Sequence, residues 1–384
     1  MHIAYVTETY PPELNGVALT VARMVRGLRS RGHSVQLVRP KQSGEAARDT
    51  DDEWRAPGMP IPMYPALRIG MPVVGRLGER WSRLRPDLVH VATEGPLGWA
   101  AVRAARLLGI PVTSDFRTNY DAYSGHYGFG WMSGAVRAYL RHFHNATDRT
   151  LVPTPAVRTE LTRKGYERLE VIGRGVDCQQ FAPARRSETL RASWGATNNV
   201  PVLLYVGRLA SEKNVPLAFR AFEAVRARVP GARMVVVGDG PMRARLEKAT
   251  PGAVFVGQQS GVALAQHYAS SDIFVFPSTT ETFGNVTLEA LASALLVVSF
   301  RSGAAAVHVE DCVNGVLVEP GDDQGFIAGA CALAQQFRWL APMRQSARDA
   351  ALQASWDTVL SRFEIFLAEA SNAVEAQLAG SCPA

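Results

Sequence analysis

The sequence predicts an α/β protein made of two doubly wound domains, each built on a parallel sheet with helices on its faces. Short runs of apolar residues, such as Val202–Val206 and Ile273–Phe276, are typical of strands buried on both faces of a parallel sheet. Segments with helical spacing of apolar residues follow most of these runs, which gives a βαβ alternation. The length of 384 residues is sufficient for two domains of ordinary size.

The expected strands form two series along the chain. The first comprises residues 2–7, 34–39, 86–91, 110–114 and 149–154, and the second 202–206, 234–237, 254–257, 273–276, 295–300 and 315–321. Residues 41–66 are polar and then rich in proline, which predicts an exposed excursion with short extended pieces. Beyond about residue 325 the pattern is helical to the end of the chain.

Composition and charge limit the kinds of protein that this chain could be. Apolar residues at 47% and charged residues at 20% are typical of a soluble globular protein, and no apolar run approaches the roughly 18 residues that span a bilayer. We therefore expect a cytoplasmic protein. The four cysteines lack the spacing of a zinc site or a disulfide framework and are expected to be reduced.

The basic residues are concentrated in the first half of the chain. Residues 1–180 hold 24 Lys and Arg against 17 Asp and Glu, whereas the remainder is nearly balanced. An anionic membrane surface or an anionic substrate could meet this charge. Nucleic acid is the least favoured partner, and we expect none, because no nucleic-acid-binding motif accompanies the basic residues. Residues 67–85 and 131–144 combine apolar and basic positions at helical spacing, which fits an ordinary surface helix or a membrane-binding one.

The strand at Ile273–Phe276 leads into a segment suited to receive an anion. Ser278 offers an N-cap oxygen, Gly284 permits close approach of a ligand to the backbone, and a helical pattern follows. Free amide groups and the helix dipole favour negative charge at such a helix start. Glu281 and Glu289 could both face one cleft if the helix begins near Phe283. The alternative is that both are ordinary surface carboxylates.

Two further loops are also placed where an anion could bind. The strand at Val202–Val206 is followed by Arg208 and Lys213, which places two cations at the carboxyl end of a parallel strand, where open α/β sheets bind ligands. The first strand is followed by a loop that ends at Gly16 and by a helix that begins near Val17. A solvated basic loop remains the alternative for Arg208 and Lys213.

Four segments together resemble one family. The strings TETFGNVTLEALAS (280–293), VGRLASEKN (206–214), PPELNGV (11–17) and RGVD (174–177) are similar to motifs of the retaining nucleotide-sugar glycosyltransferases of GT-B fold, of the family 4 type. This family includes bacterial glycolipid synthases, sulfolipid synthases and α-mannosyltransferases. The resemblance implies two doubly wound Rossmann-like domains facing across a cleft. It implies an acceptor-binding domain over residues 1–183, a nucleotide-sugar-binding domain over 184–352, and a terminal helix over 353–384 that crosses back to the first domain.

The resemblance also implies roles for individual residues. Arg208 and Lys213 would neutralise the departing diphosphate, and Glu281 would contact hydroxyls of the transferred sugar. The donor-binding residues that it implies are Asn15, Gly16, Val17, Phe283, Gly284, Asn285, Val286 and Glu289, with Glu289 on the ribose. The acceptor hydroxyl would attack from the face that the diphosphate leaves, and a phosphate oxygen would take its proton. No metal and no other cofactor would be needed.

The sequence departs from the family at Arg117. Relatives often read F-H-T-N-F at this loop, whereas Arg117 stands here in place of the histidine. A guanidinium stays charged and only donates hydrogen bonds, so Arg117 is not a general base. Its possible roles are a catalytic one on a donor carboxylate or phosphate, the binding of an anionic acceptor, or a structural replacement.

We therefore expect an enzyme that transfers a hexose from UDP-glucose, UDP-glucuronate or GDP-mannose to a hydroxyl acceptor. The basic first half favours a membrane lipid, such as diacylglycerol or phosphatidylinositol, and peripheral association with the anionic inner face of the cell membrane. The alternatives are a soluble glycosyltransferase that acts on a saccharide or small molecule, and a nucleotide-sugar-binding protein without turnover.

Overall fold

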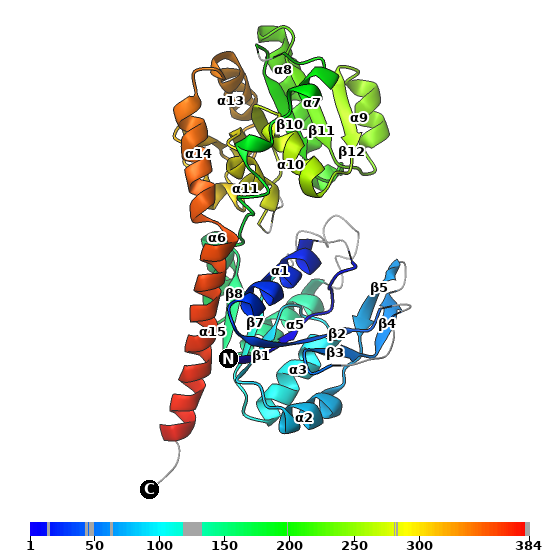
Figure 1. Cartoon of the computed structure of the whole chain (residues 1–384), viewed down its shortest axis with the longest axis vertical. Helices are drawn as coiled ribbons and strands as arrows, with labels where there is room; N and C mark the ends of the chain where they lie inside the picture. Colours follow the sequence, from blue (N-terminus) through cyan, green and yellow to red (C-terminus); the bar gives the residue numbers. More distant parts are fainter. Residues whose placement is uncertain are drawn as a thin grey trace. The chain divides into compact units, whose positions relative to one another are not determined.

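The computed structural model describes residues 1–13, 16–42, 45, 50–61, 64–117, 133–197, 199–279, 281 and 283–380 (Figure 1). The chain divides into two compact units. Unit 1 comprises Met1–Ile172 and the chain from Leu360 onward, and unit 2 comprises Gly173–Val359. The sequence led us to expect the divisions after residues 183 and 352.

Unit 1 is built on a seven-stranded parallel sheet with the order β3-β2-β1-β6-β7-β8-β9. Its strands are β1 (His2–Val6), β2 (Ser34–Pro40), β3 (Glu53–Ala56), β6 (Leu88–Val91), β7 (Val112–Asp115), β8 (Arg149–Val152) and β9 (Leu169–Val171). A separate antiparallel hairpin pairs β4 (Gly58–Ile61) with β5 (Tyr64–Gly70). Its helices are α1 (Gly16–Ser30), α2 (Val74–Arg83), α3 (Pro96–Leu107), α5 (Ser133–Asn145), α6 (Pro155–Arg163) and the greater part of α15 (Trp356–Gly380).

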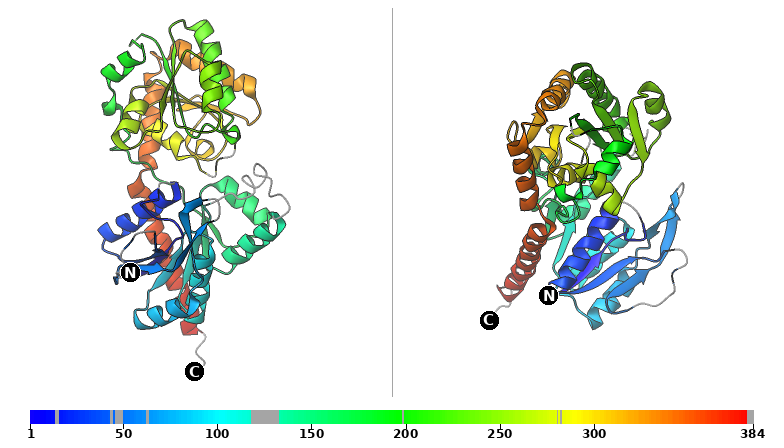
Figure 2. Two further views of the ribbon diagram at one scale, coloured as in Figure 1. Left: turned by 90° about the vertical axis from the view of Figure 1, so that its right-hand side faces the viewer. Right: turned by 45° about the horizontal axis from the view of Figure 1, so that its top comes forward.

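Helices cover both faces of this sheet because successive side chains of each strand point to opposite sides. Ala4 and Val6 of β1 belong to the core that also holds Leu77 of α2 and residues of α3. Tyr5 packs against His90 of β6, which in turn contacts Phe363 of α15. The views in Figure 2 show the helices distributed around the sheet in this way.

The segment 41–66 was expected to be exposed, and this is wrong for residues 53–56. These residues form β3, which pairs in parallel with β2 at the edge of the main sheet. Trp54 and Ala56 are buried because their side chains alternate onto the face covered by α2, whereas Glu53 and Arg55 are partly exposed. Pro57 follows β3, and Pro60 and Pro65 lie in the two strands of the hairpin.

Unit 2 contains a six-stranded parallel sheet with the order β12-β11-β10-β13-β14-β15. The strands are β10 (Val202–Val206), β11 (Arg233–Val237), β12 (Ala253–Gly257), β13 (Ile273–Phe276), β14 (Leu296–Phe300) and β15 (Gly315–Val318). The helices are α7 (Glu188–Ser193), α8 (Val215–Arg228), α9 (Arg243–Ala249), α10 (Gly261–Ala269), α11 (Asn285–Ala292), α12 (Ala305–His308), α13 (Asp323–Gln336) and α14 (Ala341–Gln353), with short 3-10 turns at Pro183–Arg185 and Ser211–Lys213.

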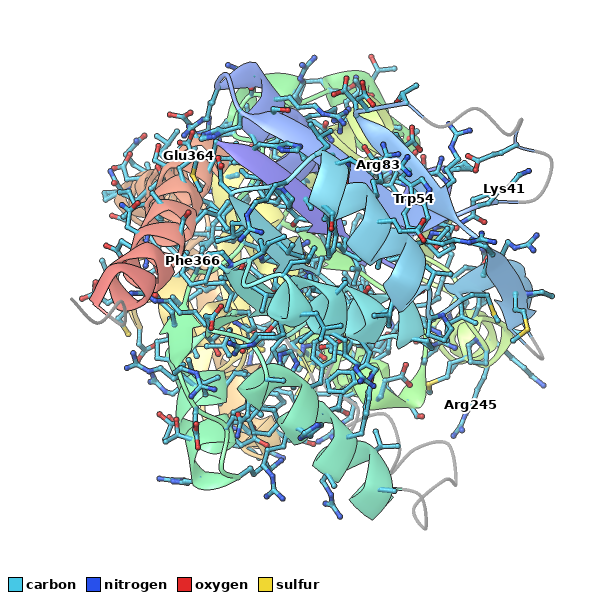
Figure 3. The ribbon with its side chains drawn as sticks, turned by 90° about the horizontal axis from the view of Figure 1, so that it is seen from below. Lys41, Trp54, Arg83, Arg245, Glu364 and Phe366 are labelled. Carbon is cyan, nitrogen blue, oxygen red and sulfur yellow. The ribbon has the colours of Figure 1, made fainter. Side chains whose placement is uncertain are left out.

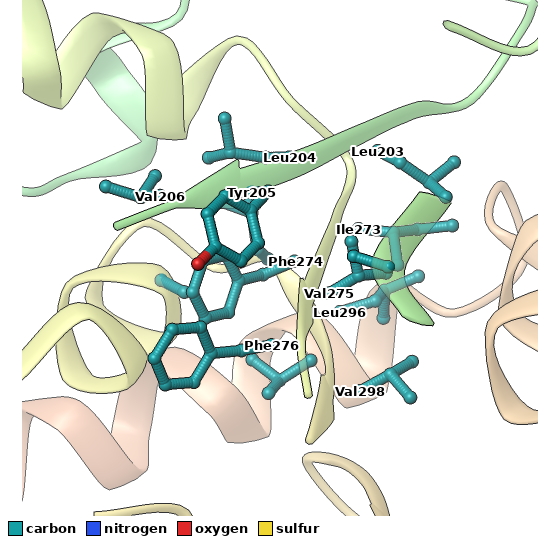
Figure 4. Packing of buried hydrophobic residues seen from close by; sticks show 14 of the residues in the cluster. Leu203, Leu204, Tyr205, Val206, Ile273, Phe274, Val275, Phe276, Leu296 and Val298 are labelled. Carbon is teal, nitrogen blue, oxygen red and sulfur yellow. The ribbon is translucent and has the colours of Figure 1, made fainter. Parts of the chain in front are cut away.

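The centre of unit 2 is the adjoining pair β10 and β13. All residues of both strands are buried, and Figure 4 shows their side chains interleaved with Leu296 and Val298 of β14. The rings of Phe274 and Phe276 stack with centroids 5.5 Å apart. This apolar packing fixes the carboxyl ends of β10 and β13, from which the two most informative loops of the sequence emerge.

From Leu360 onward, α15 is an integral part of unit 1. Phe363 and Phe366 are buried, and the side chain of Leu360 lies against Gly27 of α1. The Glu364 carboxylate accepts a hydrogen bond from the His33 ring at 2.9 Å and also pairs with Arg31.

No helix in the described ranges is long and apolar enough to cross a membrane. Cys178, Cys312 and Cys331 carry free thiols. Cys382 lies outside the described residues.

Candidate functional site

The candidate site of unit 2 lies at the carboxyl ends of β10 and β13. The strand order β11-β10-β13 reverses direction at β10, and such a switch point is where open α/β sheets place their ligand sites. The loop after β10 carries Arg208 and Lys213, and the loop after β13 carries Ser278 and Glu281. Because β10 and β13 are hydrogen-bonded neighbours, both loops leave the sheet at the same edge.

Lys213 and Glu281 are in direct contact. The Lys213 Nζ lies 2.5 Å from Glu281 Oε1, and their side chains are 17% and 14% exposed. The Ser278 hydroxyl donates a second hydrogen bond to the same carboxylate oxygen at 2.9 Å. The two residues predicted to act on the diphosphate and on the sugar therefore lie together, and both remain accessible to a ligand.

Arg208 extends further toward solvent. Its side chain is 53% exposed, and its guanidinium lies 3.6 Å from the Glu212 carboxylate. The Tyr205 hydroxyl donates to the backbone carbonyl of Arg208 at 3.2 Å, and burial raises the pKa of Tyr205, so this hydroxyl stays protonated. The hydrogen bond from Tyr205 thus fixes the backbone at Arg208, and about half of the Arg208 side chain is exposed to solvent. The Glu212 carboxylate lies beside Arg208, while Lys213 is held by Glu281.

Helix α11 begins at Asn285 and presents an uncapped N-terminus. Gly284 precedes it with φ of 86°, in the left-handed region that favours glycine, and no side chain in the described part of the chain caps the helix. Its first amide groups therefore lack intrahelical partners and carry the positive end of the helix dipole. The Asn285 side-chain oxygen is buried without a hydrogen-bond partner among the described residues. Asn285 and Val286 thus lie in the first turn of a helix start suited to a phosphate.

The loop before α11 is packed tightly against other residues of unit 2. Phe283 is 2% exposed, with its ring against His308 and the Arg174 guanidinium. A Cβ added at Gly303 would lie 2.3 Å from the Phe283 carbonyl oxygen and 3.0 Å from Glu281 Cβ. Any side chain at Gly303 would therefore displace the segment that carries Glu281.

Glu289 lies one turn into α11, in a different environment from Glu281. Burial raises the pKa of Glu289 to about 7, and a hydrogen bond with the Tyr268 hydroxyl opposes this shift. This carboxyl therefore changes charge near neutral pH, which is typical of functional sites. Val286, on the same helix, accepts a long hydrogen bond from Tyr268 at its carbonyl oxygen, at 3.4 Å.

Unit 1 contains the remaining candidates. Gly16 starts α1 and Val17 follows in its first turn, whereas Asn15 lies outside the described residues. An added Cβ at Gly16 would meet nothing within 4 Å, so packing within the unit does not require glycine there. Glu8, near the same edge, accepts hydrogen bonds from the Gly70 and Leu97 amides at 2.6 and 2.9 Å, and burial raises its pKa to about 7.

Arg117 is buried at the end of β7. Its side chain is 3% exposed and forms an ion pair with Asp115. Burial would lower the pKa of Arg117, but Asp115, Tyr5 and Glu94 together raise it, so the guanidinium stays charged. Of the three roles left open by the sequence, this geometry favours the structural replacement. Nearby, His90 bonds through Nδ1 to the Thr113 hydroxyl at 2.9 Å, and burial lowers its pKa to about 3.

Comparison with known proteins assigns the family. The profile of Glycosyltransferase Family 4 matches residues 14–180, and that of Glycosyl transferases group 1 matches residues 200–336. The chain is 34% identical over 373 residues to the GDP-mannose-dependent alpha-mannosyltransferase of Mycobacterium tuberculosis, which covers 95% of this chain and 96% of the relative. The chain belongs to glycosyltransferase family 4.

A more distant relative is the alpha-monoglucosyldiacylglycerol synthase of Acholeplasma laidlawii, at 25% identity over 84% of this chain and 86% of the relative. Among solved structures, HepE of Anabaena in complex with UDP superimposes with a TM-score of 0.75 at 18% identity, covering 96% of this chain and all of that one. That likeness confirms the fold of two Rossmann-like domains. The prediction of a glycosyltransferase of GT-B fold is therefore confirmed.

Three contacts of the candidate residues, two in unit 2 and one in unit 1, were not predicted from the sequence. Ser278 was expected to cap a helix but donates to Glu281. Tyr268 of α10 approaches Glu289, and Asp115 pairs with Arg117. The proximity of Asp115 to Arg117 in the chain gave a local signal, whereas nothing local links Tyr268 to Glu289.

Proposed function

We propose that this glycosyltransferase transfers a hexose from a nucleotide sugar, with GDP-mannose the first candidate donor, to a hydroxyl group of a membrane lipid, with retention of anomeric configuration. The observation that carries the proposal is the contact between Lys213 and Glu281 beside the uncapped start of α11. This arrangement sets a cation, a carboxylate and free amides at one edge of the sheet. The name of the relative that is 34% identical supports GDP-mannose over UDP-glucose and UDP-glucuronate.

The donor diphosphate is proposed to lie against Arg208, Lys213 and the first turn of α11. Arg208 is half-exposed, with its guanidinium 3.6 Å from the Glu212 carboxylate, and is proposed to turn toward a phosphate of the donor. Lys213 would share its ammonium group between Glu281 and a phosphate oxygen. Positive groups already in place stabilise the charge that develops on the leaving group. These side chains supply the electrophilic assistance, so the proposed transfer needs no metal.

The two glutamates are proposed to bind the two ends of the donor. Glu281, fixed by Lys213 and Ser278, accepts hydrogen bonds from hydroxyls of the transferred sugar. Glu289, one helical turn further, accepts them from the ribose. In the proposed step the bond between the sugar C1 and the diphosphate oxygen breaks. A bond from C1 to the acceptor oxygen forms on the same face, and the acceptor proton passes to a diphosphate oxygen.

Two observations support a lipid acceptor. One relative is named alpha-monoglucosyldiacylglycerol synthase, and the basic excess of this chain lies in its first half. Exposed basic residues attract a protein to anionic lipid surfaces. We propose peripheral association with such a surface.

A binding and transfer experiment tests the proposal. Thermal shifts with GDP-mannose, UDP-glucose and UDP-glucuronate should identify one stabilising donor, and the shift should be lost in Arg208→Ala. Arg226→Ala, a half-exposed arginine of α8, is the matched control. Radiolabelled transfer to a lipid extract, with and without a chelator, tests the acceptor and the metal. The anomeric configuration of the product, read by NMR, tests retention. The absence of a shift with every donor would refute the proposal.

A further inference from the structure

The chain enters unit 2 through a short segment that the proposed transfer does not use. This entry segment, residues 174–181, begins just after the first part of unit 1 ends. Val176 donates its amide to the Ala354 carbonyl at 3.0 Å and accepts a hydrogen bond from the Trp356 amide at 3.3 Å. Those partners belong to the second connection, which continues into the part of α15 that carries Glu364 (Figure 3). Both connections of unit 2 to the rest of the chain therefore meet at the entry segment.

The entry segment also contacts residues on which the proposed donor site depends. The Arg174 guanidinium lies over the ring of Phe283, 6.0 Å from its centroid, in the loop before α11. At the other end of the segment, Phe181 is buried and packs edge-on against the Tyr268 ring at 5.6 Å. Tyr268 in turn hydrogen-bonds with Glu289 of α11. The two ends of the entry segment thus support the loop before α11 and the carboxylate within that helix.

Arg348 of α14 joins the entry segment to the carboxyl end of α11. Its guanidinium donates to the carbonyl groups of Cys178 and Phe181, each at 2.7 Å, and to that of Ala292, the last residue of α11. Helix α14 packs against α11 (Figure 1). The last carbonyl groups of a helix lack intrahelical partners, and a cation there interacts favourably with the helix dipole. One guanidinium therefore ties together three backbone carbonyls that are far apart in the sequence.

Helix α11 is short enough to transmit a displacement from one end to the other. It has eight residues and is about 12 Å long. Because each turn is hydrogen-bonded to the next, a shift of its carboxyl end also moves its first amide groups and Glu289. A binding group misplaced by about 1 Å can cost about a hundredfold in rate. The geometry of the proposed donor site therefore depends on what holds Ala292.

We propose that Arg348 is a positioning residue of the donor site, which fixes α11 to the entry segment so that a donor bound at the start of α11 also orders that segment. A guanidinium suits this role because its planar fork supplies several donors in fixed directions. Arg348 acts through α11 rather than on the substrate. The effect of the donor rests on the proposed function, whereas the tie between α11 and the entry segment does not. Through this tie, occupancy of the donor site reaches both connections of unit 2.

The test is backbone hydrogen exchange, read by mass spectrometry, on wild type, Arg348→Met and Arg233→Met. Methionine keeps an apolar stem but removes the hydrogen-bond donors. Arg233 is the matched control because it also donates to two backbone carbonyls of unit 2, those of Trp194 and Gly231, at 3.2 and 3.1 Å. It lies at the amino end of β11, whereas the donor loops leave the carboxyl ends of their strands. Arg348→Lys supplies a milder loss if Arg348→Met does not fold.

Two sets of amides report the result. Those of residues 179–181 donate to Asp177 in the entry segment, and those of residues 288–295 report on α11. Without ligand, Arg348→Met should exchange at least about tenfold faster in both sets, since a hydrogen bond to a charged group contributes about that factor, and Arg233→Met in neither.

The second comparison adds saturating GDP-mannose. Wild type and Arg233→Met should then exchange more slowly in both sets, although the proposed donor contacts do not include the entry segment. In Arg348→Met the slowing should persist in α11 and be lost in the entry segment. By isothermal titration, Arg348→Met should bind GDP-mannose about 2- to 30-fold more weakly than wild type, and Arg233→Met should bind it equally well.

Three results would overturn the inference. Faster exchange in only one set of amides in ligand-free Arg348→Met would show that Arg348 does not tie the two segments together. Slowing of α11 alone in wild type with GDP-mannose would show that the donor does not order the entry segment. Equal losses of affinity in Arg348→Met and Arg233→Met would reflect general destabilisation. If GDP-mannose slows exchange nowhere in wild type, the proposed donor fails, and the ligand-free comparison still decides whether the tie exists.

Discussion

The affinity for the donor should rise about tenfold between pH 6 and pH 8, because the Glu289 carboxyl titrates in this range. Burial raises the pKa of Glu289 to about 7. A ribose hydroxyl donates to the carboxylate but finds a weaker acceptor in the neutral acid. Roughly one-tenth of the protein is ionised at Glu289 one pH unit below its pKa, and roughly nine-tenths one unit above. The apparent Kd scales inversely with that fraction.

Isothermal titration of the donor across this pH range measures the effect. The diphosphate of a nucleotide sugar stays fully ionised throughout, so its own titration does not contribute. Glu289→Gln supplies the control, because an amide does not titrate. Its affinity should be flat with pH and about 10- to 100-fold below that of wild type at the upper end, since a hydrogen bond to a charged group contributes about 1.5–3 kcal/mol.

Two outcomes would refute this reasoning. A wild-type affinity that changes less than twofold across the range would mean that the ionised carboxylate does not bind the ribose. An equal pH dependence in Glu289→Gln would assign the titration to another group.

Three further predictions concern activity and stability. Lys213→Ala should lower kcat by about 10²–10³-fold in a donor-transfer assay, because it removes one preorganised positive group from the leaving diphosphate, and a drop below tenfold would contradict that role. Ala294→Gly should raise the free energy of unfolding by about 0.5–1 kcal/mol in urea, since Ala294 has φ of 57°; no gain would show that this backbone is unstrained. Burial raises the pKa of the Glu8 carboxyl from 4.5 to about 7. The protonated carboxyl therefore contributes its full stabilisation of the fold below about pH 4.5, and this contribution is lost as the pH rises to 7. Relative to Glu8→Gln, wild type should lose up to about 3 kcal/mol across that window, and parallel stability curves for the two would contradict it.

The sequence was sufficient for the parts of the fold that local pattern controls. Strands β10 and β13 lie at the predicted residues because an unbroken apolar run bounded by Gly207 or Pro277 has few alternatives. The loops after them were predicted with the contact residues Lys213 and Glu281, since parallel neighbours bring their carboxyl ends together. The edge strand β3 was missed because only Trp54 and Ala56 of its four residues face the core.

Long-range pairing could not be predicted from the sequence. The raised pKa of Arg117 depends on Tyr5 of β1 and on Glu94 as well as on its neighbour Asp115. The raised pKa of Glu289 depends on burial of its carboxyl in the fold, and Tyr268 of α10, which opposes this rise, is distant in the sequence. Ala294 follows the C-cap of α11 and has φ of 57°, in the left-handed region that favours glycine, so this helix end carries some backbone strain.

The division of the chain has a consequence for its synthesis. Unit 2 is one continuous stretch, Gly173–Val359, inserted between the two parts of unit 1. Phe363 and Phe366 complete the core of unit 1 but emerge from the ribosome after all of unit 2. Because domains generally fold as units, unit 2 should reach its native state during translation while unit 1 waits for its last helix. A premature stop before Leu360 would therefore damage the half of the protein that was made first.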